Sequence, residues 1–113
     1  MGVKVAFLTH FPERTNPYWN MKADGDVALK LDIIWGGQET VGSAERETCI
    51  STMWRQFQSI DGGAHKRQLY DLFWETRVKG EMAEYLSLPM QVRAGGGIGL
   101  TRLLQALRKD GKL

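Results

Sequence analysis

Alternating hydrophobic positions predict two strands in the first third of the chain. Residues 3–10 (VKVAFLTH) are apolar on both alternations, which is typical of a strand covered on both faces, so we expect it at the centre of a sheet. Residues 11–20 hold two of the three prolines and predict an irregular loop, and residues 23–26 predict a tight turn. From Val27 to Trp35 every second residue is large and apolar, which predicts a half-buried strand.

The centre of the chain changes to a polar strand and then to helical spacing. Gly36-Gly37 breaks the second strand, and residues 38–47 (QETVGSAERE) predict a polar one. Apolar residues then recur with helical period over 50–60, and Asp61-Gly62-Gly63 ends that helix. A second helical stretch over 66–86 follows, which Gly80 weakens or breaks.

The last quarter predicts a short strand over 90–94, a glycine run over 95–99, and a terminal helix with leucines along one stripe. No repeat or linker divides the chain, so residues 1–113 form one predicted domain. We expect the α/β (α+β) class, with a mostly antiparallel sheet of about four strands backed by helices.

Composition places the chain among globular domains and says little about partners. Of its 113 residues, 42% are hydrophobic and 25% are charged, which suits a single core. The net charge of +2 is too small to indicate nucleic-acid or membrane binding. A lone cysteine, Cys49, favours a reducing compartment, and no segment approaches the ~20 apolar residues of a membrane span. We therefore expect a cytoplasmic protein with no membrane partner.

The glycine run before the terminal helix is the first candidate site. Free amides at a helix N-terminus and close backbone approach suit a phosphate, and Arg102 in the first turn would gain from an anion. The dinucleotide and Walker A patterns both fail here. The alternatives are a helix packed closely on a strand and an arginine that is merely solvated.

The polar strand is the second candidate site. Its carboxylate and hydroxyl oxygens suit magnesium on phosphates, and its arginine suits a substrate carboxylate. The polar residues are Glu39, Ser43, Glu45, Arg46 and Glu47. The alternative is an edge strand with a solvated ladder of ion pairs.

The spacing of Glu39 and Arg46 sets a geometric condition on any shared site. The two residues are seven positions apart, so a regular strand would face them oppositely, about 23 Å apart. Both serve one pocket only if the strand bends or bulges, and we expect this at Gly42. The two histidines and Cys49 lack the spacing of metal ligands or of a catalytic triad.

The polar strand over residues 37–47, followed later in the chain by the glycine run over 95–102, resembles the second half of a class II aminoacyl-tRNA synthetase catalytic domain, in the aspartyl/asparaginyl branch. Residues 95–102 (GGGIGLTR) resemble the third signature motif of that class, although Thr101 stands where the family usually has an acidic residue. Residues 37–47 (GQETVGSAERE) are similar to the asparaginyl-type strand. Residues 5–12 and the Pro17-Tyr18 pair resemble the strand and turn before it.

The resemblance implies a ligase that uses ATP and Mg²⁺ to adenylate the carboxylate of aspartate or asparagine. It implies that Glu39 binds the magnesium ion, that Arg102 binds the γ-phosphate of ATP, and that these two residues are the catalytic pair. It also implies that Gly97 and Gly99 lie beside the nucleotide. It further implies that Arg46, together with Ser43, binds the amino-acid substrate. Both tRNA synthetases and the related archaeal asparagine synthetases fit, with tRNA as a further partner in the first case. The alternatives are a non-catalytic paralogue that acts as a binding or regulatory module and, less favoured by the charge, a small RNA-binding domain.

Two motifs of the resembled family have no counterpart in the sequence. These are the first motif, which forms the dimer interface, and the second, whose arginine binds the α-phosphate. We therefore expect an activity that is incomplete alone, and a homo-oligomer or a complementary chain that carries the missing motifs. An unpaired strand edge and an incompletely covered face over residues 27–35 would favour such pairing.

Overall fold

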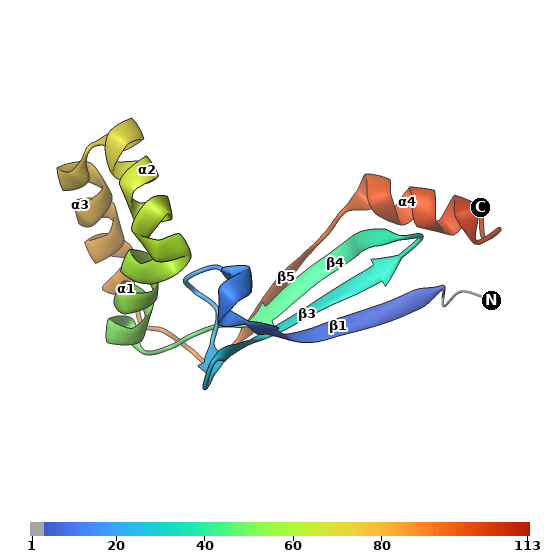
Figure 1. Ribbon diagram of the computed structural model, residues 1–113, viewed down its shortest axis with the longest axis horizontal. Helices are drawn as coiled ribbons and strands as arrows, with labels where there is room; N and C mark the ends of the chain where they lie inside the picture. The colour runs from blue at the N-terminus through green and yellow to red at the C-terminus, as the bar shows by residue number, and fades with distance from the viewer. Residues whose placement is uncertain (1–3) are drawn as a thin grey trace.

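A computed structural model describes residues 4–113 as an antiparallel sheet of five strands and a separate group of helices (Figure 1). In chain order, the elements are β1 Val5–Pro12, η1 Glu13–Thr15, β2 Ala23–Asp24, β3 Val27–Trp35, β4 Gln38–Glu45, α1 Ile50–Ser59, η2 Ile60–Gly63, α2 Ala64–Phe73, α3 Glu75–Leu86, β5 Ala94–Ile98 and α4 Leu100–Lys109. The sheet order is β1-β3-β4-β5, and the short β2 also pairs with β3. The predicted class, an antiparallel sheet with helices, is confirmed.

The main hydrophobic core lies among α1, α2 and α3, which we call the helical lobe. Met53 and Phe57 of α1 are completely buried, and burial of each side chain stabilises the fold by about 1.5–3 kcal/mol. Trp19, from the loop between β1 and β2, inserts into this core with its ring centroid 5.9 Å from that of Phe57. The amide of Gln56 donates hydrogen bonds to the carbonyls of Trp19 and Met21. This loop therefore anchors the helical lobe to the sheet.

The predicted second helix is interrupted at Trp74 and not at Gly80. Trp74 has a φ of 67°, in the left-handed region, so α2 ends before it and α3 begins after it. Gly80 lies within α3, with nothing within 4 Å of where a Cβ would stand. A glycine inside a helix costs only about 0.5–1 kcal/mol, whereas a left-handed residue cannot continue the helix. Gly80 therefore does not break the helix, and the break lies at Trp74 instead.

β1 lies at the edge of the sheet, so the prediction of a central strand was wrong. Among the strands that the structure describes, it pairs only with β3, and Phe7 and Leu8 are 65% and 49% exposed. Residue 3, the start of the predicted strand, lies outside the described residues. Apolar residues on both alternations indicate a strand that is covered, but residues 4–113 supply neither a second neighbouring strand nor a cover for it.

The last strand, β5, is formed by the glycine run itself and begins at Ala94, whereas the sequence predicted a strand over residues 90–94 before that run. β5 pairs with β4 so that Gly97 lies opposite Gly42 and Gly95 opposite Ala44. A Cβ on Gly96 would stand 2.7 Å from the carbonyl oxygen of Gly42, closer than a methyl group can approach. The two strands are therefore this close because the run is glycine, as the close-packing interpretation of the run requires.

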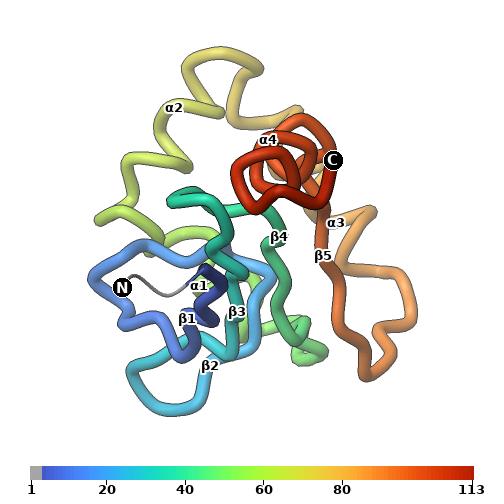
Figure 2. Tube along the Cα trace, turned by 90° about the vertical axis from the view of Figure 1, so that its right-hand side faces the viewer, coloured from blue at the N-terminus to red at the C-terminus, as the bar shows by residue number. Residues whose placement is uncertain are grey.

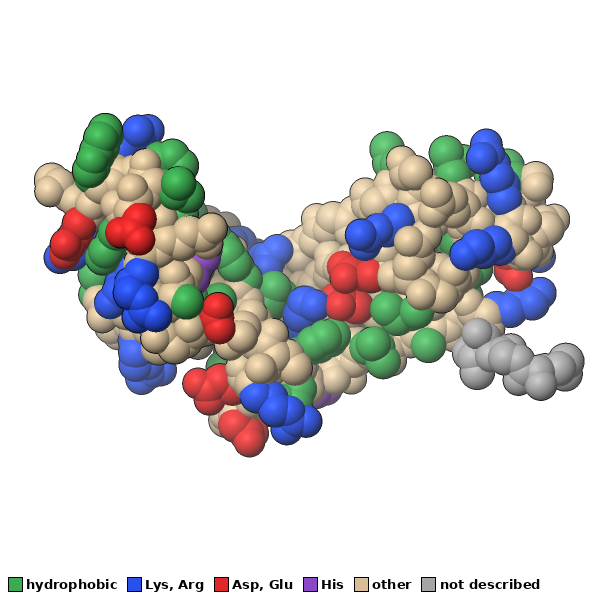
Figure 3. Space-filling model, turned by 45° about the horizontal axis from the view of Figure 1, so that its top comes forward, with side chains coloured by type: hydrophobic (Ala, Val, Ile, Leu, Met, Phe, Trp, Pro, Cys, Tyr) green, Lys and Arg blue, Asp and Glu red, His purple; other side chains and the backbone are tan. Residues whose placement is uncertain are grey.

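α4 packs against β4 at the end of the sheet far from the helical lobe (Figures 1 and 2). Ala106 is buried there against Gly36, in the turn between β3 and β4. Leu100 and Leu104 remain exposed, so the predicted leucine stripe is only partly covered. Between α4 and the helical lobe the surface is hollowed (Figure 3). None of the helices in residues 4–113 has the length and apolarity needed to cross a membrane.

Candidate functional site

An irregularity in β4 decides which polar side chains share a face of the sheet. The pairing of β4 with β3 shifts between Glu39 and Val41, so Thr40 has no partner residue on β3. The Thr40 side chain is buried and donates a hydrogen bond of 3.1 Å to the carbonyl of Ile33. One additional residue reverses the alternation, and Glu39 therefore points to the same face as Gly42. The expected bulge exists, but it lies at Thr40 and not at Gly42.

The absence of a side chain on Gly42 leaves room for two carboxylates. A Cβ on Gly42 would stand 2.5 Å from Oε1 of Glu39 and 3.5 Å from Oδ1 of Asp32. Both distances start from the same point, so Oε1 of Glu39 and Oδ1 of Asp32 lie no further apart than 2.5 Å and 3.5 Å added together. Asp32 lies directly opposite Gly42 on β3 and is only 5% exposed, whereas Glu39 is exposed. The structure therefore pairs the predicted magnesium ligand Glu39 with a buried carboxylate that has no role in the sequence-based prediction.

Asp32 uses only one of its two oxygens. Oδ2 lies 2.8 Å from Nζ of Lys30, and that ammonium also stands 3.9 Å above the centre of the Phe11 ring. Oδ1 is buried without a hydrogen-bond partner. Such a group costs about 1–3 kcal/mol when it is left unpaired, so a cation at Oδ1 would be stabilised.

This pair of carboxylates fits a magnesium ion that is shared with a ligand. Among residues 4–113, no group of three or more His, Cys, Asp or Glu side chains could hold a metal on its own. Magnesium, however, is commonly held by one or two carboxylates together with substrate phosphates. The buried and unpartnered Oδ1 of Asp32, next to Glu39, meets this requirement.

Arg46 reaches the same face from the end of β4. A Cβ on Gly95 would stand 2.9 Å from Nε and 3.0 Å from Nη2 of Arg46, so the guanidinium occupies the space that glycine leaves on β5. Gly95 lies opposite Ala44, on the face to which Gly42 belongs. The carboxylate of Glu39 thus lies beside Gly42, and the guanidinium of Arg46 lies beside Gly95, which pairs with the residue two positions further along β4. The structure thus brings the two residues together.

Arg102 lies next to Glu39 but contacts its backbone. Its Nη1 donates a hydrogen bond of 3.1 Å to the carbonyl oxygen of Glu39, and its side chain packs on Gly99. Gly97 is open, with nothing within 4 Å of where a Cβ would stand. Two cavities of about 430 and 460 Å³ lie elsewhere, and none of these residues lines them. The roles of Arg102, Gly97 and Gly99 toward a nucleotide stay predictions.

Ser43 does not lie on the face of the sheet that holds Glu39 and Arg46. It follows Gly42 directly on a regular part of β4, so its side chain points to the opposite face. Its hydroxyl donates a hydrogen bond of 3.2 Å to the carbonyl of Leu31. The predicted substrate set is corrected on this point, because Ser43 and Arg46 do not face the same side of the sheet.

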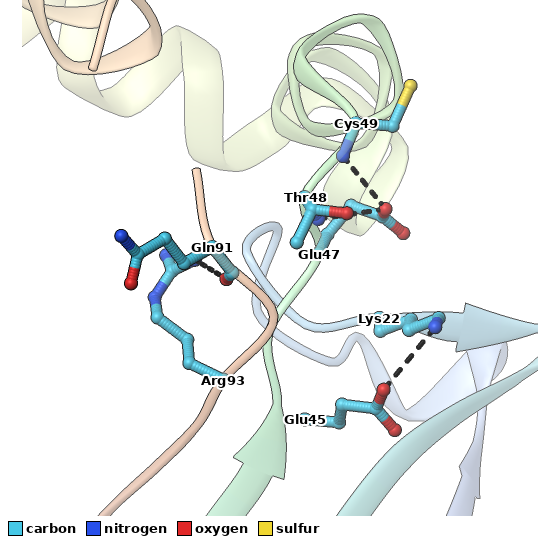
Figure 4. A network of polar contacts seen from close by, with 7 residues as sticks. All are labelled: Lys22, Glu45, Glu47, Thr48, Cys49, Gln91 and Arg93. Carbon is cyan, nitrogen blue, oxygen red and sulfur yellow. Dashed lines mark hydrogen bonds and ion pairs between the residues drawn. The ribbon is translucent and has the colours of Figure 1, made fainter. Parts of the chain in front are cut away.

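The other two acidic residues of the polar strand have structural contacts (Figure 4). Glu45 forms an ion pair of 3.3 Å with Lys22, in the segment before β2. The carboxylate of Glu47 accepts hydrogen bonds of 3.0 Å from the backbone N–H groups of Thr48 and Cys49, where α1 begins. Glu47 thus places a negative charge just before the N-terminus of α1, where the helix dipole favours it.

Comparison with known proteins gives a consistent set of relatives, although no protein-family model matches the chain. The chain is 25% identical over 101 residues to an aspartate–tRNA(Asp/Asn) ligase of Methanopyrus kandleri, a match that covers 89% of this chain and 21% of that protein. Its fold matches asparaginyl-tRNA synthetase of Pyrococcus horikoshii in complex with asparaginyl-adenylate, with a TM-score of 0.66, 16% identity, and coverage of 93% of this chain and 22% of that one.

Aspartyl-tRNA synthetase of Entamoeba histolytica matches with a TM-score of 0.62 and 19% identity over 91% of this chain and 19% of its own. The chain thus spans about a fifth of the length of these proteins, and it corresponds to their C-terminal part. In sequence and in fold, over about nine-tenths of its length, the chain resembles the aspartyl- and asparaginyl-tRNA synthetases, enzymes of class II.

Proposed function

We propose that the chain supplies part of the active site of an ATP-dependent ligase that adenylates aspartate or asparagine. The observation that carries this proposal is the bulge at Thr40, because it turns Glu39 to the face that holds Asp32 and Arg46. Two carboxylates for a metal ion and a guanidinium for a substrate carboxylate or amide thereby stand within reach of one small ligand.

Each residue has a distinct role in the proposed site. Asp32 and Glu39 would hold Mg²⁺, which would neutralise the phosphates of ATP when bound. Arg102 has no ion-pair partner among residues 4–113, so its outer N–H groups can bind the γ-phosphate. Arg46 offers a planar pair of donors that distinguishes a carboxylate or an amide oxygen from an apolar side chain.

The proposed activity needs a second component. The relatives are about five times as long as the matched region, so the whole reaction, tRNA binding and a cytosolic setting are proposals for this chain. The exposed apolar residues of β1 support an oligomer or a complementary chain that also brings the remaining phosphate-binding arginine.

Calorimetric titration with Mg·ATP tests the binding part of the proposal. Glu39→Ala and Arg102→Ala should each weaken binding at least about tenfold, since each removes a charged contact. Glu45→Ala is the matched control, because this residue lies on the same strand and pairs with Lys22 instead. Unchanged affinity in the first two variants, or no binding by the unmodified chain, would show that the assignment is wrong.

Pyrophosphate exchange tests the catalytic part. We expect exchange with aspartate or asparagine only after a chain carrying the two missing class II motifs is added. A non-catalytic binding module is the second candidate, and the contact between Lys30 and Asp32 favours it, because an ammonium stands on a proposed metal ligand. Binding of Mg·ATP without any exchange in the reconstituted complex would support this second candidate over the ligase.

A further inference from the structure

Among residues 4–113, Lys30 is the one cation that contacts the carboxylate pair directly, and this ion pair is more buried than the others there. The side chains of Lys30 and Asp32 are 20% and 7% exposed. In each of the other ion pairs found within residues 4–113, at least one partner is 46% exposed or more. The Lys30 stem is also held in place, because its ammonium stands over the Phe11 ring. This contact is therefore a fixed part of the site and not a solvated surface pair.

The position of Lys30 conflicts with permanent occupation of the site by a metal ion. A divalent cation between Oδ1 of Asp32 and Glu39 would stand on a carboxylate whose other oxygen already holds an ammonium. Two cations on one carboxylate repel each other, and the repulsion is large where water is excluded. Either the metal binds weakly or the ammonium has to move.

We propose that Lys30 is a built-in competitor for the divalent cation at the Asp32–Glu39 pair. The proposal concerns the site described under the proposed function and rests on it for the identity of the metal site. Without ligand, the ammonium neutralises Asp32 and keeps the affinity for a free metal ion low. A metal that arrives with a phosphate-bearing ligand releases the ammonium, which can then turn to the negative charge of that ligand. The site would thus take up metal and anion together and discriminate against metal alone.

Titration with Mn²⁺ alone, followed by the paramagnetic resonance signal of the free ion, tests this proposal. Lys30→Met removes the charge and keeps an apolar stem on Phe11, and it should bind Mn²⁺ at least about tenfold more tightly than the unmodified chain. Lys22→Met is the matched control, because it breaks a comparable ion pair with Glu45 away from the carboxylate pair. It should leave the affinity for Mn²⁺ unchanged. In the double variant Lys30→Met/Asp32→Asn the gain should disappear.

A second variant and a second measurement cover the loss of folding that an unpaired buried carboxylate could cause. Lys30→Gln keeps a hydrogen-bond donor without the charge and should show the same gain. Mn²⁺ should also raise the melting temperature of both variants more than that of the unmodified chain. Equal or weaker Mn²⁺ binding in both variants, an equal gain in Lys22→Met, or no detectable binding in any of them would overturn the proposal. Because no nucleotide is present, these results are independent of the Mg·ATP titration that tests the proposed function.

Discussion

Single alanine substitutions at the three consecutive glycines of β5 should give three different results, although the chemical change is the same. None of the three has a positive φ, so alanine fits the backbone at each position. A Cβ on Gly97 meets nothing within 4 Å, while one on Gly96 stands 2.7 Å from the carbonyl oxygen of Gly42 and 2.8 Å from Cβ of Ser43. On Gly95 it meets the flexible guanidinium of Arg46. The outcomes therefore depend on what each new methyl group displaces.

The magnitudes follow from those neighbours. Gly97→Ala should stabilise the fold by about 0.5–1 kcal/mol, because alanine loses less backbone entropy on folding. Gly96→Ala should destabilise it by about 1–3 kcal/mol, because backbone atoms of β4 have to move. Gly95→Ala should change stability little, since a side chain can turn away, but it should displace Arg46 and weaken amino-acid binding in the reconstituted site.

Thermal unfolding followed by circular dichroism, with urea denaturation as a second method, measures the difference. The gap between Gly96→Ala and Gly97→Ala is about 1.5–4 kcal/mol, which corresponds to roughly 6–16 °C in melting temperature for a domain of this size. A Gly96→Ala variant that melts at or above the temperature of Gly97→Ala would refute the close approach of β4 and β5.

Three further substitutions test other parts of the structure. Hydrogen bonds from Ser51 and Thr52 lower the pKa of the exposed Cys49 thiol to about 7, so its alkylation rate should rise with pH through a midpoint near 7. Ser51→Ala should raise that midpoint. A midpoint near the ordinary ~8.5 in the unmodified chain would contradict the contact. Trp74→Gly should raise the free energy of unfolding by about 1 kcal/mol, because glycine adopts a φ of 67° without strain, and a lower melting temperature would argue against that backbone. Arg46→Lys keeps the charge and loses the planar donor pair, so preference for asparagine or aspartate over leucine should fall in exchange assays, and unchanged preference would remove Arg46 from the substrate site.

The fold could be predicted where a pattern in one segment determines the structure of that segment. β3, α1 and the turn before β3 follow directly from local periodicity and from turn residues. The position of β1 could not be predicted in this way, because its exposure depends on which strands pair with it. The break at Trp74 was also hidden, since residue type gives no sign that a tryptophan adopts a left-handed conformation.

For the site too, the residues could be predicted from the sequence, but their arrangement in space could not. Glu39, Arg46 and Arg102 could be named from residue type, spacing and family resemblance. Their shared surroundings depend on the strand register, because one unpaired residue, Thr40, decides which face Glu39 occupies. Asp32 could have been noticed as an acidic residue in an otherwise half-buried strand. Its pairing with Lys30 and its closeness to Glu39 required the structure, because one contact lies along β3 and the other crosses to β4.

Completion of the sheet and completion of the site are connected through β5. Within residues 4–113, β5 pairs only with β4, so its outer edge carries unpaired backbone donors and acceptors. The same strand borders the face on which Glu39 and Arg46 lie, and its glycines leave that face open at Gly97. A strand added along this edge would therefore satisfy the backbone of β5 and, with the same residues, place new side chains beside the proposed nucleotide. If the complementary chain pairs with β5, and not only with the exposed edge at β1, pairing at the edge and assembly of the proposed site would occur in one step.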